Sequence, residues 1–228
     1  MRLVFASNNA HKLSEVRAIM PAEVTVLSLR DIGFEAEIDE TGSTLEENSL
    51  IKAQTVWDFI NDGMSAAKPL NDGLEVDGVF ADDTGLEIDV LGGEPGVYTA
   101  RWYTHEPTLT LPRGKGVTEE MMNFQCNRAK ALRELEGKED RGCQFRTVIT
   151  LIKSNPTLPK EKEIIQVEGV VRGQITTEEH GTGGFGYDPI FIPEGYDKTF
   201  GELPAEIKNH ISHRARALEE LVKVLQNL

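Results

Sequence analysis

Two consecutive carboxylates, Asp82 and Asp83, follow a short apolar run at residues 79–81 and precede Thr84 and Gly85. Hard cations such as Mg²⁺ prefer one or two carboxylates together with the phosphate oxygens of a substrate. The pair therefore predicts a divalent metal site at the end of a strand, of a kind used in nucleotide phosphate chemistry. A plain turn is the alternative, because Asp and Gly are common where strands end.

Two observations narrow the kind of metal site. Consecutive strand residues point to opposite faces of a sheet, so Asp82 and Asp83 reach one metal ion only if the chain bends between them. Zinc is not expected, because the histidines and cysteines do not take zinc-ligand spacing. The nearest approach to that spacing, His210 with His213, lacks further partners.

A second group of polar side chains lies on a predicted helix that runs from Thr44 to about Ile60. Thr44 and Glu47 form a capping-box pattern, which favours a helix start at this point. Asn48 and Lys52 fall on the apolar stripe of this helix. Lys52 either extends its ammonium past the stripe to water or, given a carboxylate pair elsewhere, binds phosphate.

The segment Ser7-Asn8-Asn9-Ala10-His11-Lys12 connects a predicted strand at residues 3–6 to the first predicted helix. Free N–H groups at a helix start attract anions, and Lys12 adds a positive charge. The segment lacks the glycines and the Gly-Lys-Ser/Thr order of a Walker loop. An ordinary capped helix start is therefore the alternative.

Two later segments also offer contacts to a ligand. The glycine-rich run at 181–186 leads into Phe185-Gly186-Tyr187-Asp188, where backbone can approach a ligand and aromatic rings can stack on a base. Lys208, His213 and Arg214 cluster around the predicted start of the last helix, which offers cations and N–H donors to an anion or a carbonyl. A tight turn packed by aromatic rings and a solvated basic helix end are the respective alternatives.

The chain as a whole has the composition of a folded protein, with 228 residues, 39% hydrophobic and 27% charged. A formal net charge of −14 argues against wrapping a nucleic acid polymer, whereas a small anionic ligand needs only a local group of cations. Cys126 and Cys143 have no C-x-x-C spacing and are predicted to be buried thiols. No apolar run is long enough for a signal peptide or a membrane span, so a soluble, cytoplasmic protein is expected.

Strand and helix patterns alternate early in the chain and strands pair later, which predicts an α/β fold with a mixed sheet. Strands are predicted at residues 3–6, 24–29, 79–81, 86–91, 145–152 and 164–171, the last two as an antiparallel pair. Further helices are predicted from Thr118 to about Gly137 and from Ser212 onward. Loops are predicted near residues 61–77 and 104–116.

In their order along the chain, these segments closely resemble the inosine triphosphate pyrophosphatase family, enzymes that remove non-canonical purine nucleoside triphosphates such as ITP, dITP and XTP. The resemblance spans nearly the whole chain, and the ordered motifs make it highly specific. The matching stretches are SNNAHKLSEV, ETGSTLEENSLIKA, ADDTGLEIDVLGGEPGVYTARW, GGFGYDPIFIPEGYDKTF and ELPAEIKNHISHRARAL.

The resemblance implies an elongated mixed β-sheet with flanking helices that form two lobes around a substrate cleft, in a single domain spanning residues 1–228. It also implies a homodimer and Mg²⁺-dependent hydrolysis to a nucleoside monophosphate and pyrophosphate. By motif, Asp83 takes the place of the catalytic carboxylate, and Glu40 and Asp83 take the places of the metal ligands. The family's substrate-contact positions correspond to Ser7, Asn8, Asn9, Ala10, His11, Lys12, Lys52 and Thr84, and its base-recognition positions to Phe185, Gly186, Tyr187, Asp188, Lys208, His213 and Arg214.

This sequence departs from the family pattern in three respects. Asn8 stands where the family usually has Gly, and Thr84 stands where it usually has Ser. The predicted loops near 61–77 and 104–116 look like insertions, longer than is typical. The resemblance therefore implies the reaction more closely than the range of substrates.

Two other classes of protein fit part of the pattern. Phosphatases with an aspartyl nucleophile also place aspartates after an apolar strand, but with D-x-D-x-T in place of D-D-T. A non-enzymatic nucleotide sensor would keep the phosphate lysines and the aromatic loop while needing neither Glu40 nor Asp83.

Overall fold

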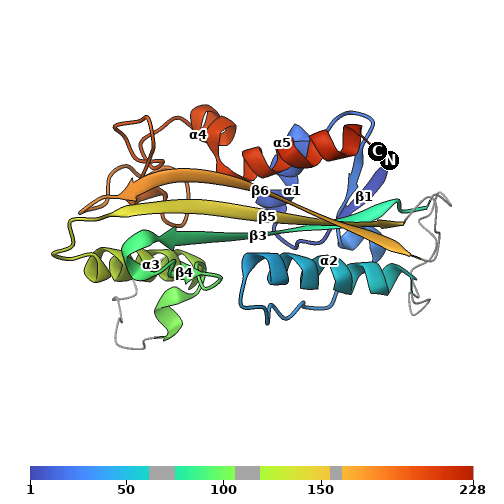
Figure 1. Ribbon diagram of the computed structural model, residues 1–228, viewed down its shortest axis with the longest axis horizontal. Coiled ribbons are helices and arrows are strands. Elements are labelled where there is room, and N and C mark those ends of the chain that lie inside the picture. The colour runs from blue at the N-terminus through green and yellow to red at the C-terminus, as the bar shows by residue number, and fades with distance from the viewer. Residues whose placement is uncertain (62–74, 106–118, 155–160, 228) are drawn as a thin grey trace. The chain divides into compact units, whose positions relative to one another are not determined.

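The computed structural model describes residues 1–61, 75–105, 119–154 and 161–227, whose strands form one sheet with helices packed on it (Figure 1). The strands are β1 (Arg2–Phe5), β2 (Thr25–Leu27), β3 (Gly78–Ile88), β4 (Pro95–Gly96), β5 (Gly142–Ser154), β6 (Lys162–Ile175) and β7 (Phe191–Pro193). The helices are α1 (Ala10–Ile19), α2 (Leu45–Asn61), α3 (Glu119–Glu134), α4 (Ala205–Ile211) and α5 (His213–Gln226). Within these ranges no helix combines the length and the apolar character needed to traverse a bilayer.

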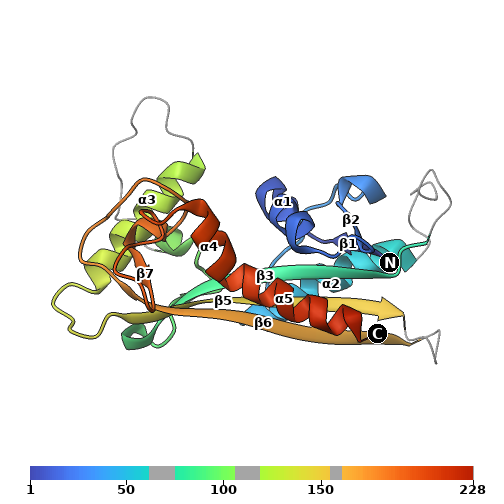
Figure 2. The same ribbon diagram turned by 90° about the horizontal axis from the view of Figure 1, so that it is seen from above.

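The sheet is mixed, which confirms the α/β class predicted from the sequence. The strand order is β2-β1-β3-β5-β6-β7, with β4 paired to β3. β1 is parallel to β2 and β3, as helical crossovers require, whereas β4 and β7 are antiparallel to their partners. β5 and β6 are neighbours that run in opposite directions, so the predicted antiparallel pair is confirmed (Figures 1 and 2).

The chain forms two compact units. Unit 1 comprises Met1–Asp83, Thr147–Gly169 and Arg214–Leu228, and unit 2 comprises Thr84–Arg146 and Val170–His213. The boundaries fall inside β3, β5 and β6, so each of these strands contributes residues to both units.

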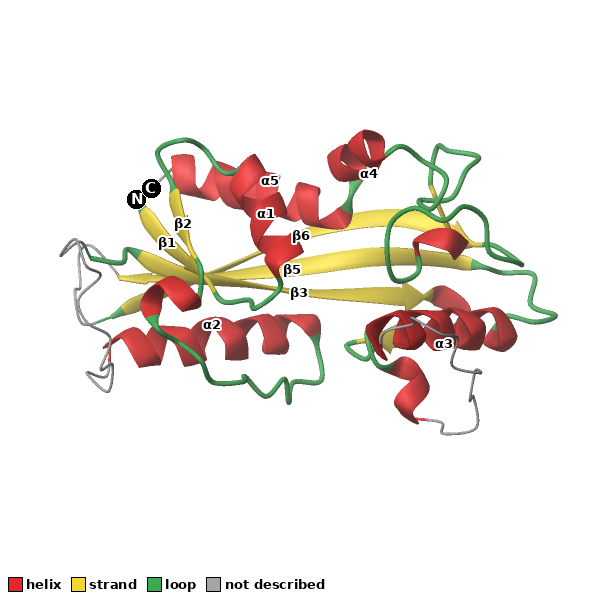
Figure 3. Cartoon of the chain, turned by 180° about the vertical axis from the view of Figure 1, so that it is seen from behind, coloured by secondary structure: helices red, strands yellow, loops and turns green. Residues whose placement is uncertain are grey.

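Helices cover both faces of the strands in unit 1, with α2 on one side and α1 and α5 on the other (Figure 3). Phe80 of β3 belongs to the same buried cluster as Leu218 of α5. Its neighbours Val79 and Ala81 belong to a second cluster with Val56 of α2. Side chains along β3 therefore alternate between the two helix layers, as strand geometry requires.

Aromatic rings fill the core of unit 2. The Phe191 ring lies 4.7 Å from Phe145 and 5.1 Å from Phe200, measured between ring centroids. α3 adds Ala131 and Leu135 to the same buried cluster. This packing supports the loops at the ends of β6 and β7, which carry several of the predicted site residues.

The prediction of two short strands at residues 79–81 and 86–91 is wrong, because β3 runs without a break from Gly78 to Ile88. Asp82 and Asp83 therefore lie in mid-strand and not at a strand end. The sequence indicated a turn because Asp, Thr and Gly interrupt the apolar pattern here. In the structure each aspartate has a cationic partner, which offsets the cost of burying its charge in a strand.

Lys208, predicted to lie near the start of the last helix, precedes that helix. Lys208 lies in α4, a separate short helix that the sequence analysis did not anticipate. Ser212 has extended backbone, with φ −65° and ψ 151°, and so divides α4 from α5. α5 begins at His213, directly after the predicted cap.

Most of the predicted insertions near 61–77 and 104–116 fall at residues 62–74 and 106–118, which lie outside the described residues. The same is true of the predicted helix cap Thr118. α3 is described from Glu119, and it ends at Glu134, slightly before the predicted end.

Cys126 and Cys143 are both buried, as predicted. Burial raises the pKa of the Cys143 thiol to about 12, so very little of it is thiolate at mildly alkaline pH. We expect neither thiol of the native protein to react quickly with an aromatic disulfide reagent, and both to react after unfolding in urea. Absorbance of the released thiol measures this. Rapid labelling of Cys143 in the native protein, located by mass spectrometry, would contradict the packing of unit 2.

Candidate functional site

Asp82 and Asp83 are both buried in β3, at 3% and 8% exposure. Because they are consecutive strand residues, their carboxylates leave the strand on opposite sides. Asp83 has a cationic partner on α2, whereas Asp82 has partners near the starts of α1 and α5. The bend that would let both carboxylates reach one metal ion is therefore absent, because β3 continues through both residues.

The Lys52 ammonium joins two carboxylates. Its Nζ donates to Oδ1 of Asp83 at 2.8 Å and to Oε1 of Glu40 at 2.9 Å. The side chains of Lys52 and Asp83 are nearly buried, whereas that of Glu40 is 32% exposed. An acid on a strand, an acid in a loop and a lysine on a helix thus form one group, called here the Lys52 cluster.

Burial and charge act on the Lys52 cluster in opposite ways. Burial raises the pKa of Asp83, and the ion pair with Lys52 opposes that rise only in part. Burial alone would lower the pKa of Lys52, but Asp83, Asp82 and Glu40 outweigh it and raise that pKa. The cluster therefore places a fixed cation against a carboxylate that is more basic than an exposed one.

The start of α2 holds the loop that carries Glu40. The predicted capping pattern is present, since the Glu47 N–H donates to the Thr44 hydroxyl at 3.1 Å. One residue further, the buried Asn48 accepts a hydrogen bond from the Gly42 N–H at 2.8 Å. Asn48 thus ties the loop to the helix just after Glu40, a role that its place on the apolar stripe did not indicate.

A second group lies on the opposite face of β3 and is called here the Asp82 cluster. Lys12 Nζ lies 3.0 Å from Oδ1 and 2.9 Å from Oδ2 of Asp82. Arg214 donates from Nε to Oδ2 of Asp82 at 3.2 Å and from Nη1 to Glu15 at 2.6 Å. Burial would raise the pKa of Asp82, but Lys12 and Arg214 outweigh it and hold that pKa well below its usual range.

The pKa of Lys12 is lowered, chiefly because its partly buried side chain loses hydration, and Arg214 and Lys52 lower it further against the attraction of Asp82. Asp82 is therefore the group that favours a charged Lys12. The pKa of Arg214 is raised, because burial would lower it but the negative charges of Asp82 and Glu15 outweigh that effect.

The predicted helix start after β1 is present. The Asn9 side chain accepts from the Lys12 N–H at 3.1 Å, and the Asn9 N–H donates to the Ser7 hydroxyl at 3.2 Å. Asn9 therefore caps α1 and sets the turn that presents Lys12 to Asp82. The exposed residues of this segment are Asn8, Asn9, Ala10 and His11.

In unit 2, Lys208 brings together part of the predicted aromatic loop. Its ammonium pairs with Oδ2 of Asp188 and lies 4.3 Å from the centroid of the Phe185 ring. The same carboxylate oxygen accepts from the Phe185 N–H at 2.7 Å. Phe185 is 51% exposed and Tyr187 only 3%, so Phe185 is the aromatic ring of this loop that offers surface to a base.

Three further predicted positions, His213, Tyr187 and Thr84, lie apart from the ion pairs described above. His213 stacks on Phe145, with ring centroids 4.9 Å apart and 21° between the planes. Tyr187 is a core residue whose hydroxyl donates to the Thr99 carbonyl at 3.1 Å. Thr84 is partly buried in β3, next to Asp83 in sequence and in the other unit.

Two charged residues that contact predicted site residues were not themselves predicted from the sequence. Glu15 follows Lys12 by three residues on α1, and that spacing, which places both on one helix face, was the available signal. Arg128 donates to the Gly186 carbonyl at 2.9 Å and to Glu179 at 2.8 Å, and so supports the aromatic loop. Its partners are distant in sequence, so no local pattern could have found them.

Mg²⁺ fits the Lys52 cluster in that two carboxylates, Glu40 and Asp83, already converge on one cation. No group of three or more His, Cys, Asp or Glu side chains in the described ranges is arranged to hold a metal. An ion held by two protein carboxylates would complete its coordination with water and substrate phosphate oxygens, which is the usual arrangement for Mg²⁺.

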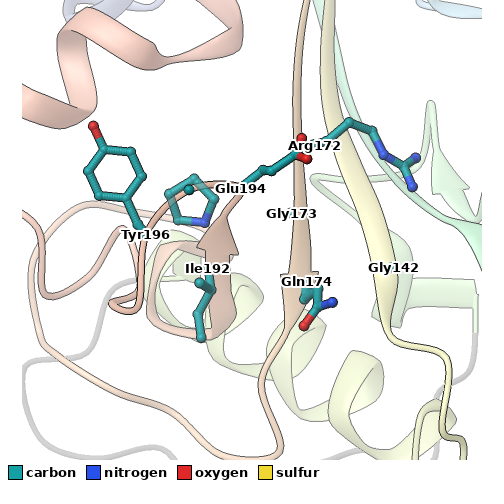
Figure 4. Close-up of a pocket in the computed structure, with 9 residues that line it drawn as sticks. Gly142, Arg172, Gly173, Gln174, Ile192, Glu194 and Tyr196 are labelled. Atoms are coloured by element: carbon teal, nitrogen blue, oxygen red, sulfur yellow. The ribbon is translucent and has the colours of Figure 1, made fainter.

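A separate hollow of about 390 Å³ lies in unit 2 beside β6 and β7 (Figure 4). Arg172, Glu194 and Tyr196 are among its lining residues. None of the predicted site residues lines it. Arg172 is already paired with Asp89, so the hollow does not present an unpaired cation to an anionic ligand.

The site thus combines an α/β sheet with lysines held by buried carboxylates on both faces of one strand, and cations of this kind can bind phosphate oxygens. The chain belongs to the Ham1 family, whose model matches residues 3–224.

The similar proteins match over nearly their full length. The chain is 42% identical over 225 residues to the dITP/XTP pyrophosphatase of Flavobacterium johnsoniae, covering 99% of this chain and 98% of that protein. It is 42% identical over 226 residues to the dITP/XTP pyrophosphatase of Bacillus subtilis, covering 98% and 96%. The Staphylococcus aureus Ham1 protein has a similar structure, with a TM-score of 0.74, 34% identity, and 100% and 99% of the two chains covered. The resemblance inferred from the motifs is confirmed.

Lys52→Met removes the cation shared by Glu40 and Asp83, and with it the ion pair of the buried Asp83 carboxylate. We expect the free energy of unfolding in a chelator to fall by roughly 3 kcal/mol. Added Mg²⁺ should restore stability more strongly than it stabilises the unaltered protein, because a divalent ion can replace the ammonium. Denaturant unfolding with and without Mg²⁺ measures both effects.

Lys12→Met is the matched control, since it removes the same kind of side chain from Asp82 on the other face of β3. Mg²⁺ should give this variant no extra stability. Equal restoration of both variants would contradict the placement of the metal at the Lys52 cluster.

Proposed function

We propose that this protein hydrolyses non-canonical purine nucleoside triphosphates, namely ITP, dITP and XTP, to the monophosphate and pyrophosphate in a Mg²⁺-dependent reaction. The observation that carries the proposal is the contact of Lys52 with both Glu40 and Asp83, which combines a phosphate-binding cation with two candidate metal ligands. The similar proteins named dITP/XTP pyrophosphatase support the substrate class.

Unit 1 supplies the groups for the triphosphate. The segment from Ser7 to Lys12 offers the N–H groups of a helix start, and Lys12 and Lys52 offer ammonium groups. Both lysines also contact carboxylates, so their positions are set before substrate binds. Preorganised cations of this kind stabilise charge that develops on phosphate oxygens without having to rearrange.

Asp83 is the carboxylate proposed to act on the attacking water. Lys52 holds this carboxylate in a fixed orientation, and a carboxylate so placed can accept a proton from a water within hydrogen-bond reach. Mg²⁺ held by Glu40 and Asp83 would supply further positive charge to the phosphate oxygens. As the water oxygen bonds to the α-phosphorus, its proton passes to Asp83, and the bond from the α-phosphorus to the bridging oxygen breaks. The electron pair leaves with pyrophosphate, whose charge Lys12 and Lys52 offset.

The family resemblance assigns several residues to recognition of the base. The exposed Phe185 ring offers a surface for stacking, and Lys208 holds one side of that ring by a cation–π contact. Hydrogen-bond donors at His213 and Arg214 would meet the 6-keto oxygen of hypoxanthine or xanthine. Adenine presents an amino group at that position, and two donors facing each other leave buried polar groups unpaired.

The family resemblance extends the proposal to the setting of the reaction. The protein would act in the cytoplasm as a homodimer and would remove non-canonical nucleotides from the nucleotide pool. Its partner is a small molecule, and the net charge of −14 does not favour a nucleic acid polymer.

Incubation with Mg²⁺ and each of ITP, dITP, XTP, GTP and ATP tests the reaction. We expect monophosphate and pyrophosphate from the first three substrates and little turnover of ATP, as measured by ion-exchange chromatography of the products. In ¹⁸O-labelled water the label should appear in the monophosphate, because attack is on the α-phosphorus.

Two outcomes would contradict the proposed pyrophosphatase activity and favour another class of protein. Release of inorganic phosphate from the γ-position would favour a phosphatase with an aspartyl nucleophile. Tight binding of ITP without any product would favour a nucleotide sensor.

Asp83→Asn removes the proposed proton acceptor and one metal ligand while keeping the size of the side chain. We expect kcat for ITP to fall about a thousandfold or more, with the protein still folded by circular dichroism. Asp89→Asn makes the same chemical change at an acid paired with Arg172 in unit 2, and it should leave kcat within about twofold. Full activity of Asp83→Asn would remove Asp83 from the catalytic role.

A further inference from the structure

Asp82 adjoins Asp83 in β3 but lies in a different environment. Its cationic partners are Lys12 and Arg214, whereas Asp83 is paired with Lys52. β3 continues through both residues, so the strand pleat keeps their carboxylates on opposite sides. Phe80, two residues earlier and therefore on the same face as Asp82, packs in the cluster that includes α1 and α5.

Both carboxylate oxygens of Asp82 are already engaged by cations. Lys12 lies 3.0 Å from Oδ1 and 2.9 Å from Oδ2, and Arg214 lies 3.2 Å from Oδ2. The Asp82 side chain is only 3% exposed. A metal ion at this carboxylate would have to displace two positive charges that also repel it.

Lys12, by contrast, is available to a ligand as well as to Asp82. Its side chain is 23% exposed, and it lies at the helix start proposed to receive the triphosphate. An ammonium carries several N–H donors on a flexible stem, so it can bond a carboxylate and a phosphate together once its position is held. The buried Asp82 carboxylate holds the Lys12 ammonium in position.

We propose that Asp82 is a positioning residue that holds the Lys12 ammonium for the triphosphate and does not ligate the metal. Arg214, anchored at its other end by Glu15 at 2.6 Å, holds the Asp82 carboxylate in turn. This inference rests on the proposed function, since it assigns a role within the same triphosphate site.

Asp82→Asn distinguishes a positioning role from a simple charge effect, because the two predict opposite changes in the affinity for a polyphosphate. If only charge mattered, removing a carboxylate near a polyphosphate would tighten its binding. If Asp82 positions Lys12, losing the restraint weakens binding, and we expect the dissociation constant to rise about tenfold. Asp82→Glu keeps the charge and should recover most of the affinity.

The measurement uses an ITP analogue with a methylene group between the α- and β-phosphates, titrated calorimetrically in the presence of Mg²⁺, so no turnover is needed. Mn²⁺ binding, followed by electron paramagnetic resonance, reports the metal site separately. Asp82→Asn should keep its Mn²⁺ affinity within about twofold, whereas Asp83→Asn should lose about tenfold or more. Glu87→Gln, an acid on the same strand paired with Arg146 at 3.1 Å, is the control and should change neither affinity.

A double-mutant cycle tests whether Asp82 acts through Lys12. The double variant Lys12→Met/Asp82→Asn should bind the analogue no more than about twofold more weakly than Lys12→Met alone. This comparison also decides the question if Asp82→Asn does not fold, because removing one lysine and one aspartate together keeps the charge of the cluster balanced.

Three results would overturn the inference: tighter analogue binding by Asp82→Asn, additive losses in the double variant, or loss of Mn²⁺ affinity whenever Asp82 is replaced. Because these titrations need no hydrolysis, they are independent of the products formed. A protein that bound the analogue as expected but did not convert ITP to monophosphate would overturn the proposed function and leave the role of Asp82 in binding supported.

Discussion

The alternation of side chains along β3 is the constraint on which both charged clusters of unit 1 depend. Two adjacent carboxylates are buried in one strand, and each needs its own cation because an unpaired buried charge is strongly destabilising. The pleat sends one toward α2 and the other toward α1 and α5. The register of a single strand therefore dictates where two lysines must lie, Lys12 near the start of α1 and Lys52 about two turns into α2.

A carboxylate that orients a cation recurs in unit 2. Asp188 pairs with Lys208 and also accepts the Phe185 N–H, so one side chain sets both the ammonium and the ring over which it lies. The arrangement leaves Phe185 half exposed while Tyr187, two residues later, is packed in the core. In both units the acidic groups therefore hold the protein's own cations in place.

The sequence predicted the α/β class, the antiparallel pair and the start of α2, because these depend on local periodicity and capping. It did not predict the continuity of β3, since Asp-Asp-Thr-Gly is a turn signal unless distant cations make burial possible. The contact of Arg214 with Asp82 joins residues 132 positions apart, and no local pattern records it. Glu40 was found only through the family resemblance, because its contact with Lys52 depends on how the loop before α2 folds back.

Gly42 has no side chain that could take part in the reaction, but its size determines where Glu40 lies. A Cβ atom at this position would lie 2.7 Å from the side-chain oxygen Oδ1 of Asn48 and 2.7 Å from Glu47 Cβ, closer than Cβ atoms come to non-bonded neighbours in folded proteins. Any larger residue would push the loop off α2 and carry Glu40 away from Lys52. A descendant of this chain could therefore keep every charged residue of the cluster and still lose its geometry through the gain of one methyl group.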